Sequence, residues 1–139
     1  MKVVIDTNVL LISIPKLSKY RPIFNGLLRK QYNLAISESI LQEYLEIIGR
    51  KTTGQIAQNL GELLLSLENV EKTEIYFRWN LIHADPDDNK FVDCAISARV
   101  RFIVTNDNHF KELKDIEFPP VEVINADDFL EELKKLEKK

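Results

Sequence analysis

The sequence contains few of the residues that build disulfide frameworks, zinc sites or phosphate loops. It has one cysteine among 139 residues, and its histidines, His83 and His109, stand far apart. The lone cysteine, Cys94, cannot form an internal disulfide, and this set of residues cannot supply a cysteine-based zinc site. The four glycines form no glycine-rich loop, which disfavours a nucleotide-binding domain.

Long apolar runs are missing as well. No run approaches the roughly 20 residues that a membrane-spanning helix needs. Near the amino terminus, Asp6 and Asn8 interrupt the segment that would form the apolar core of a signal peptide. We therefore expect a cytoplasmic protein that does not enter a membrane.

Neither sign of charge is in large excess. Lys and Arg number 19, Asp and Glu number 22, and the formal net charge is −3. This balance argues against strong nonspecific adhesion to nucleic acid. It does not exclude a nucleic-acid enzyme, because cations can neutralise a group of acids. The composition, with 45% hydrophobic residues, is that of a globular protein, and the length suits one domain over residues 1–139.

Short apolar runs rich in β-branched residues alternate with amphipathic helical patterns along the chain. Strands are expected at residues 3–5, 34–36, 102–104 and 121–124, with a weaker candidate at 75–77. Helices are expected at residues 20–30, 37–50, 53–68, 86–100 and 125–138. Ser37 or Ser39 should cap the helix at 37–50, and Gly49 should end it. Because such alternation is typical of a parallel sheet covered on both faces, the sequence predicts a three-layer α/β/α sandwich with a mainly parallel central sheet.

Two of the expected strands are followed by aspartates. Asp6 ends the strand at 3–5, and Asp107 comes soon after the strand at 102–104. Either residue alone could simply cap a helix that follows it in the sequence, since Asp is a favoured N-terminal cap. In a parallel sheet, however, the carboxyl ends of the strands meet at one edge, and sites form beyond that edge. Together the two aspartates favour a site there.

A third acid comes from the helix expected at 86–100. On a helical wheel, Asp88 falls on the same side as the apolar residues Phe91, Val92, Ala95 and Ile96. A carboxylate in the first turn is favoured by the helix dipole, but it is costly to bury unless it is paired or bound to a metal. Asp93 falls on the far side and should be solvated or supporting, whereas Asp85 and Asp87 should be turn or cap residues.

The fourth acid, Glu43, borders the apolar stripe of the helix at 37–50. Carboxylates are hard oxygen ligands that suit Mg²⁺ or Mn²⁺, and like charges packed together need a cation. His109 should lie at the surface, with an auxiliary role at most. The acids therefore predict a magnesium-type site for one or two ions, formed by Asp6, Glu43, Asp88 and Asp107.

Three segments resemble the PIN domain family, and especially its VapC-like ribonucleases, the toxins of toxin–antitoxin systems. They are "VVIDTNVLLIS" at 3–13, "SESILQEYLEII" at 37–48 and "DPDDNKFVDCAISARVRFIVTNDNHF" at 85–110. The resemblance implies a parallel sheet flanked by helices and an acidic site that binds Mg²⁺ or Mn²⁺. It also implies hydrolysis of RNA to products with 5′-phosphate and 3′-hydroxyl ends.

The resemblance assigns roles to residues by their places in these motifs. The four acids already chosen match the family's metal-binding and catalytic positions, and the polar residues Thr7, Asn8 and Thr105 match positions that support the site through hydrogen bonds. The loop "ADPDDNK" allows several registers, so Asp87 and Asp93 remain alternatives to Asp88. Val100 stands near the place where the family often has a glycine, which should change only the turn there.

Substrate and partner residues are less sharply indicated. Candidates for phosphate contacts are the basic residues Arg50, Lys51 and Lys90. The aromatic residues Tyr20, Tyr76, Phe77 and Trp79 could stack on bases, although packing within the core or between subunits is favoured. The resemblance implies an RNA substrate, a homodimer and an antitoxin that enters the active-site groove. An exposed apolar patch on the helices from Tyr44 to Leu67 would suit such a partner, because the stretch 56–67 has more leucines than one buried stripe needs.

Two other functions fit the same residues. A PIN-domain nuclease of RNA processing or quality control would use the same acids, so the sequence cannot separate it from a toxin. A non-catalytic PIN-like module that binds RNA or protein is the second, and the presence of all four acids argues against it.

Overall fold

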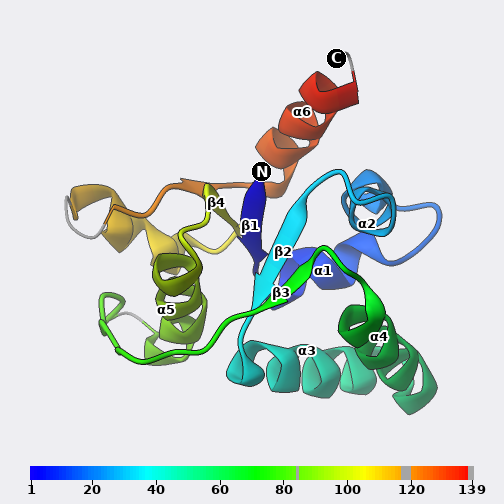
Figure 1. The fold of residues 1–139 in the computed structure, drawn as a ribbon, viewed down its shortest axis with the longest axis horizontal. Helices are drawn as coiled ribbons and strands as arrows, with labels where there is room; N and C mark the ends of the chain where they lie inside the picture. The colour runs from blue at the N-terminus through cyan, green and yellow to red at the C-terminus, as the bar shows by residue number, and fades with distance from the viewer. Residues whose placement is uncertain (84, 117–119, 138–139) are drawn as a thin grey trace.

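The computed structural model describes residues 1–83, 85–116 and 120–137. Within them, five parallel strands form one sheet in the order β3-β2-β1-β4-β5 (Figure 1). The strands are β1 (Lys2–Ile5), β2 (Asn33–Ile36), β3 (Val70–Lys72), β4 (Phe102–Val104) and β5 (Val123–Ile124). The expected parallel sheet is confirmed, and β1 lies at its centre.

Helices cover both faces of this sheet. The α-helices are α1 (Thr7–Ser13), α2 (Arg21–Leu28), α3 (Glu38–Lys51), α4 (Gly54–Ser66), α5 (Asn89–Ala98) and α6 (Ala126–Glu137). In Figure 1, α5 lies on one side of the strands, whereas α1, α2 and α4 lie on the other. The predicted three-layer α/β/α arrangement is therefore confirmed. None of the helices formed by the described residues is long and apolar enough to cross a membrane.

The middle of the sheet is apolar because both of its faces are covered. Residues 3–5 of β1 are fully buried, and the strand register sets Ile5 beside Val104 of β4. Burial of each such side chain contributes roughly 1.5–3 kcal/mol. The next residue of each strand, Asp6 after β1 and Thr105 after β4, therefore leaves the sheet at the same edge.

The helix α1 was not expected from the sequence. The apolar run continues past Asp6, so its length gave no sign of where the strand stops and the helix begins. Helix α3 also differs from expectation at its end, because it continues past Gly49 to Lys51. Its cap is Ser37, whose hydroxyl accepts a hydrogen bond from the backbone N–H of Ile40 at 3.3 Å.

The ends of the other expected helices and strands lie close to expectation, whereas strand β3 was not expected from the sequence. Two further short helices, the 3₁₀ helices η1 (Pro86–Asp88) and η2 (Asn108–Asp115), occur in the described residues. The last strand is shorter than the expected 121–124, since only Val123 and Ile124 pair with β4. Lys138, at the expected end of the last helix, lies outside the described residues.

The weak strand expected at 75–77 is wrong. Residues 73–83, all of which are described, contain neither helix nor strand. Side chains of α5 pair with the backbone of this segment instead: Asp93 accepts from the Trp79 N–H at 3.0 Å, and Asn89 bonds to both the N–H and the carbonyl of Ile82 at 2.8 and 3.0 Å. After Thr73, whose N–H donates to the carbonyl of Ile36 in β2 at 2.7 Å, the segment is therefore attached to α5 and not to the sheet.

Tyr44 joins α3 to the end of β1. Its side chain is fully buried, and its hydroxyl donates a hydrogen bond to the carbonyl oxygen of Ile5, the residue before Asp6. A buried hydroxyl is costly unless it is paired. This bond therefore helps to fix the helix that carries Glu43 against the strand that ends in Asp6.

We predict that Tyr44→Phe lowers the free energy of unfolding by roughly 1–3 kcal/mol, because the Ile5 carbonyl loses its buried partner. Urea denaturation measures the change. The matched control is Tyr76→Phe, which removes an exposed hydroxyl that pairs with Glu74 and should change stability by less than about 0.5 kcal/mol. Equal losses in the two variants would contradict the role given to Tyr44.

Candidate metal centre

Asp6 is buried at the carboxyl edge of the sheet. It is 5% exposed, and its backbone N–H donates to the carbonyl of Val104 at 2.9 Å, which extends the pairing of β1 with β4. Its carboxylate makes no capping bond to α1 and instead accepts a hydrogen bond from the Thr105 hydroxyl at 2.7 Å. Asp6 therefore follows the expectation of a site residue more closely than that of a helix cap.

Asp107 both caps a helix and lies beside Asp6. Its carboxylate accepts the backbone N–H of His109 at 2.9 Å at the start of η2, as a cap would. Its own backbone N–H donates to the Thr105 hydroxyl at 3.0 Å. Since that hydroxyl also donates to Asp6, the buried Thr105 connects the two aspartates.

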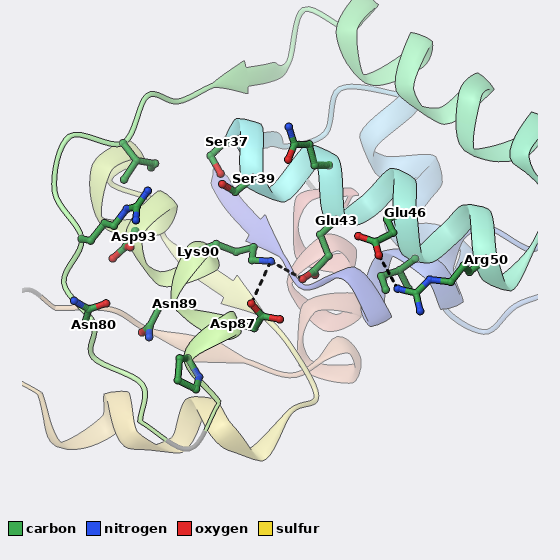
Figure 2. A pocket seen from close by; sticks show the side chains of 15 residues that line it. Ser37, Ser39, Glu43, Glu46, Arg50, Asn80, Asp87, Asn89, Lys90 and Asp93 are labelled. Carbon is green, nitrogen blue, oxygen red and sulfur yellow. Dashed lines mark hydrogen bonds and ion pairs between the residues drawn. The ribbon is translucent and has the colours of Figure 1, made fainter.

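Glu43 reaches the same edge from α3. One of its carboxylate oxygens accepts a hydrogen bond from the hydroxyl of Thr7, the residue after Asp6. The other lies 2.8 Å from the ammonium nitrogen of Lys90, and both of these side chains are largely buried. Figure 2 shows Lys90 extending from α5 towards Glu43. The contacts fix the Glu43 carboxylate between α1 and α5.

Asp88 enters the centre from the junction of η1 and α5. Its side chain is 13% exposed, and one carboxylate oxygen lies 3.1 Å from Nδ1 of His109. The same nitrogen lies 3.1 Å from a carboxylate oxygen of Asp107 and 3.9 Å from one of Asp85. Potential ligand atoms of Asp85, Asp88 and His109 all lie within 4.8 Å of one another, so these residues could hold a metal ion.

Burial and electrostatic interactions among the acids shift their pKa values. Burial raises the pKa of Asp6, and the charges of Asp107 and Glu43 raise it further, while the hydrogen bond from Thr105 lowers it. Burial also raises the pKa of Asp88 to about 6, a rise to which the charges of Asp107, Asp85 and Asp6 contribute. Carboxylates that converge and repel in this way are stabilised by a cation. The donor set therefore fits a divalent ion.

The alternatives to Asp88 lie elsewhere. The side chain of Asp87 is 85% exposed, and its nearest recorded ion-pair partner is Lys90 at 4.0 Å. Asp93 faces the segment 73–83, where it accepts the Trp79 N–H. Of the two roles expected for Asp93, solvated or supporting, the first is wrong, because that segment folds over it and leaves it 5% exposed. A helical wheel cannot anticipate a covering segment that has no regular structure.

The polar and basic residues predicted to support the site or to contact substrate differ in burial and in their contacts. Thr7 and Thr105 are buried and donate to acids of the centre, whereas Asn8 is exposed on α1. Arg50 and Lys51 are exposed at the end of α3, and Arg50 pairs with Glu46 at 2.9 Å. Of the basic candidates, Lys90 is the one that contacts an acid of the centre.

An open pocket of about 540 Å³ adjoins Glu43. It lies between α3, α5 and the segment 73–83, and Figure 2 shows the side chains of Glu43, Lys90 and Asp93 along it. Arg78 also lines it and was not chosen from the sequence; its place between the aromatic residues Phe77 and Trp79 is the signal that could have found it.

His109 is the centre residue that sequence reasoning undervalued. Its side chain is 42% exposed, as expected for a surface residue, but it contacts Asp88 and Asp107. The signal was its position two residues after Asp107, because an aspartate that accepts the N–H of the second residue along turns the chain back on itself. Asp85 has the expected cap role, since it accepts the N–H of Asp87 at 3.1 Å, and it also lies near His109.

The fold is similar to that of chains in two VapBC complexes and to that of an endonuclease, all of known structure. A chain of VapBC2 from Rickettsia felis, bound to a DNA fragment from their promoter, is 21% identical with a TM-score of 0.61, over 90% of this chain and 98% of that chain. A chain of DNA-bound VapBC from Salmonella typhimurium is 21% identical with a TM-score of 0.59, over 91% and 98%. The PIN domain endonuclease Utp24 is 19% identical with a TM-score of 0.53, over 89% and 84%.

Sequence comparison decides the family. A search among curated proteins found no match. The family profile described as PIN domain, however, matches residues 2–109, a stretch that contains all four of the candidate acids. Because this match covers most of the chain and agrees with the fold, the chain belongs to the PIN domain family.

Proposed function

We propose that this protein is a metal-dependent endoribonuclease that hydrolyses phosphodiester bonds of RNA with one or two Mg²⁺ or Mn²⁺ ions. The observation that carries the proposal is the convergence of acids from separate elements at one edge of the sheet in a PIN domain. These acids are Asp6, Glu43, Asp88 and Asp107. A domain that only binds RNA or protein has no need of such a repelling group.

In this proposal Asp6, Asp88 and Asp107 hold the ion or ions, and Glu43 completes the set. Bound there, a divalent ion would neutralise the phosphodiester and activate water for an in-line displacement. The hydroxyls of Thr7 and Thr105 orient the carboxylates of Glu43 and Asp6, whereas the supporting role of Asn8, which is exposed on α1, rests on the resemblance of its motif alone. Burial of these threonines keeps water away from the bonds that set the geometry.

The pocket beside Glu43 suits a strand of RNA. Its lining includes the basic side chains of Arg50, Arg78 and Lys90, which we propose contact phosphates together with Lys51. Such contacts position a strand without reading its bases. Of the four candidate acids, Glu43 lines this pocket, so a backbone phosphate would lie beside Glu43 while its neighbours contact the basic side chains.

The physiological role we favour is that of a toxin paired with an antitoxin, in the cytoplasm, with the chain acting as one domain over residues 1–139. The VapBC complexes among the structural neighbours support this role. A homodimer is part of the proposal, and the exposed apolar side chains Ile56 and Leu65 on α4 are suited to a partner surface. The likeness to the endonuclease Utp24 keeps an RNA-processing nuclease as the second candidate.

The first test is cleavage of single-stranded and structured RNA with Mg²⁺, Mn²⁺ or EDTA. We expect cleavage by the unaltered protein to need the ion, and Asp6→Asn to reduce the rate roughly a hundredfold or more. The matched control is Asp128→Asn, an exposed acid of α6, which should cleave normally. Cleavage that persists in EDTA or in Asp6→Asn would contradict the proposal.

The register of the third acid has its own test. Asp88→Asn should reduce metal-dependent cleavage about as strongly as Asp6→Asn, because its carboxylate faces His109 and Asp107. Asp87→Asn, one residue away and exposed, should keep the rate within about threefold. A large loss of cleavage in Asp87→Asn with little loss in Asp88→Asn would instead identify Asp87 as the third acid.

Burial of the Asp88 carboxylate, together with repulsion from its neighbouring acids, should also appear in the stability of the metal-free protein. The pKa of Asp88 is about 6, raised from 3.8, so its ionisation opposes folding. Below about pH 4 it is protonated in both states and the cost vanishes, whereas above about pH 6 the full cost is present. In EDTA, Asp88→Asn should therefore raise the free energy of unfolding by roughly 1–2 kcal/mol at about pH 8 and by much less at about pH 4.

The matched comparison for stability is Asp128→Asn, which should show no such dependence on pH. Denaturant unfolding at the two pH values measures both variants. A loss of stability in Asp88→Asn at about pH 8 would show that the carboxylate is stabilised by its neighbours and would contradict the repulsion.

A further inference from the structure

Histidine is a residue type that can bind metal ions, and the proposed mechanism gives His109 no role. Its Nδ1 atom lies 3.1 Å from carboxylate oxygens of both Asp88 and Asp107, and 3.9 Å from one of Asp85. These acids come from two separate parts of the chain, η1 with its flanking residues and the turn after β4. The imidazole is therefore the point at which the two parts meet.

The fold holds His109 in this place. The Asp107 carboxylate accepts its backbone N–H at 2.9 Å, so the turn fixes the backbone. The next residue, Phe110, is fully buried and makes an edge contact with Phe91 of α5 at 6.5 Å between ring centroids. Since α5 begins directly after Asp88, packing of Phe110 sets His109 against the acid of that helix.

The distances from His109 Nδ1 to the nearby carboxylate oxygens match the distances between ligand atoms around a small ion. Adjacent ligands of an octahedral ion with bonds of about 2.1 Å lie about 3.0 Å apart, and opposite ligands lie about 4.2 Å apart. The distances from His109 Nδ1 to the oxygens of Asp88, Asp107 and Asp85 fall at 3.1, 3.1 and 3.9 Å. One ion could therefore be reached by the imidazole and by carboxylates without a large rearrangement.

We propose that His109 is a ligand of the metal centre, and that it makes the centre select a first-row transition ion such as Mn²⁺ or Co²⁺ over Mg²⁺. This inference rests on the proposed function, since it concerns the same ion. An imidazole nitrogen is a softer donor than a carboxylate and binds transition ions well. Mg²⁺ prefers oxygen, gives up its waters reluctantly and gains little from a nitrogen ligand.

The test is calorimetric titration of the full chain with Mn²⁺, Co²⁺ and Mg²⁺, each alone, at about pH 8, which is above the ordinary pKa of an imidazole. The variant is His109→Asn, whose amide oxygen is a hard donor of similar reach. We expect Mn²⁺ and Co²⁺ to bind at least about tenfold more weakly to the variant, while the Mg²⁺ affinity stays within about threefold. The control is His83→Asn, which changes the other, exposed histidine and should bind all three ions normally.

A second readout reports the bond itself. In pulsed electron paramagnetic resonance of the Mn²⁺-loaded protein, a ligating imidazole couples its ¹⁴N nucleus to the ion. We expect that coupling in the unaltered protein and in His83→Asn, and its loss in His109→Asn. Thermal unfolding in EDTA checks that the variants are folded, which the exposure of both histidine side chains favours.

Unchanged Mn²⁺ and Co²⁺ affinity in His109→Asn would overturn the inference while leaving a metal-dependent nuclease intact. Tighter binding of all three ions by the variant would also overturn it, because it would show His109 to be a cation that competes with the metal. If the unaltered protein binds none of the ions, both this inference and the metal-dependent function fail. RNA cleavage is not needed for any of these outcomes, so the two failures are distinguishable.

Discussion

The site depends on a single hydroxyl group placed between two strands. Thr105 follows β4, is buried, donates to the Asp6 carboxylate and accepts the backbone N–H of Asp107. It can do so only because the parallel pairing of β1 with β4 carries both strands to the same edge. The apolar residues of the two strands set that register, and a shift of one residue would move the acids to opposite faces. The chemistry at the edge is thus specified by packing in the middle of the sheet.

Bringing acids together in this way lowers the stability of the fold, and basic side chains of the same chain offset part of this cost. Lys90 pairs with Glu43, and His109 lies against Asp88 and Asp107. The hydrogen bond that the His109 imidazole donates to the Asp88 carboxylate raises the pKa of His109, which favours its charged form when no ion is bound. The protein therefore holds cationic side chains beside its acids, and any incoming ion must take over some of their contacts.

The sequence was sufficient for four of the five strands, and it indicated a set of candidate acids, because both follow from local patterns; strand β3 was not expected. Apolar runs marked β1 and β4, and the residues after them marked the site edge. It was insufficient wherever the outcome depended on contacts between distant segments. The α1 helix was hidden in a continuous apolar run, and the burial of Asp93 depends on residues 73–83 folding over it. His109 was undervalued for the same reason, since its partner Asp88 is 21 residues away.

The attachment of residues 73–83 has a consequence for the pocket they border. No bonds of a strand ladder hold this stretch after the Thr73 N–H, and its described anchors are side-chain groups of α5 and Glu112. Ile82 of this stretch is buried in the apolar core, whereas Tyr76 and Phe77 are exposed. The exposed part of this wall can therefore open at a lower free energy than global unfolding, because few bonds hold it and no strand ladder includes it. Access to the pocket from this side is thereby separated from the stability of the acid-bearing edge.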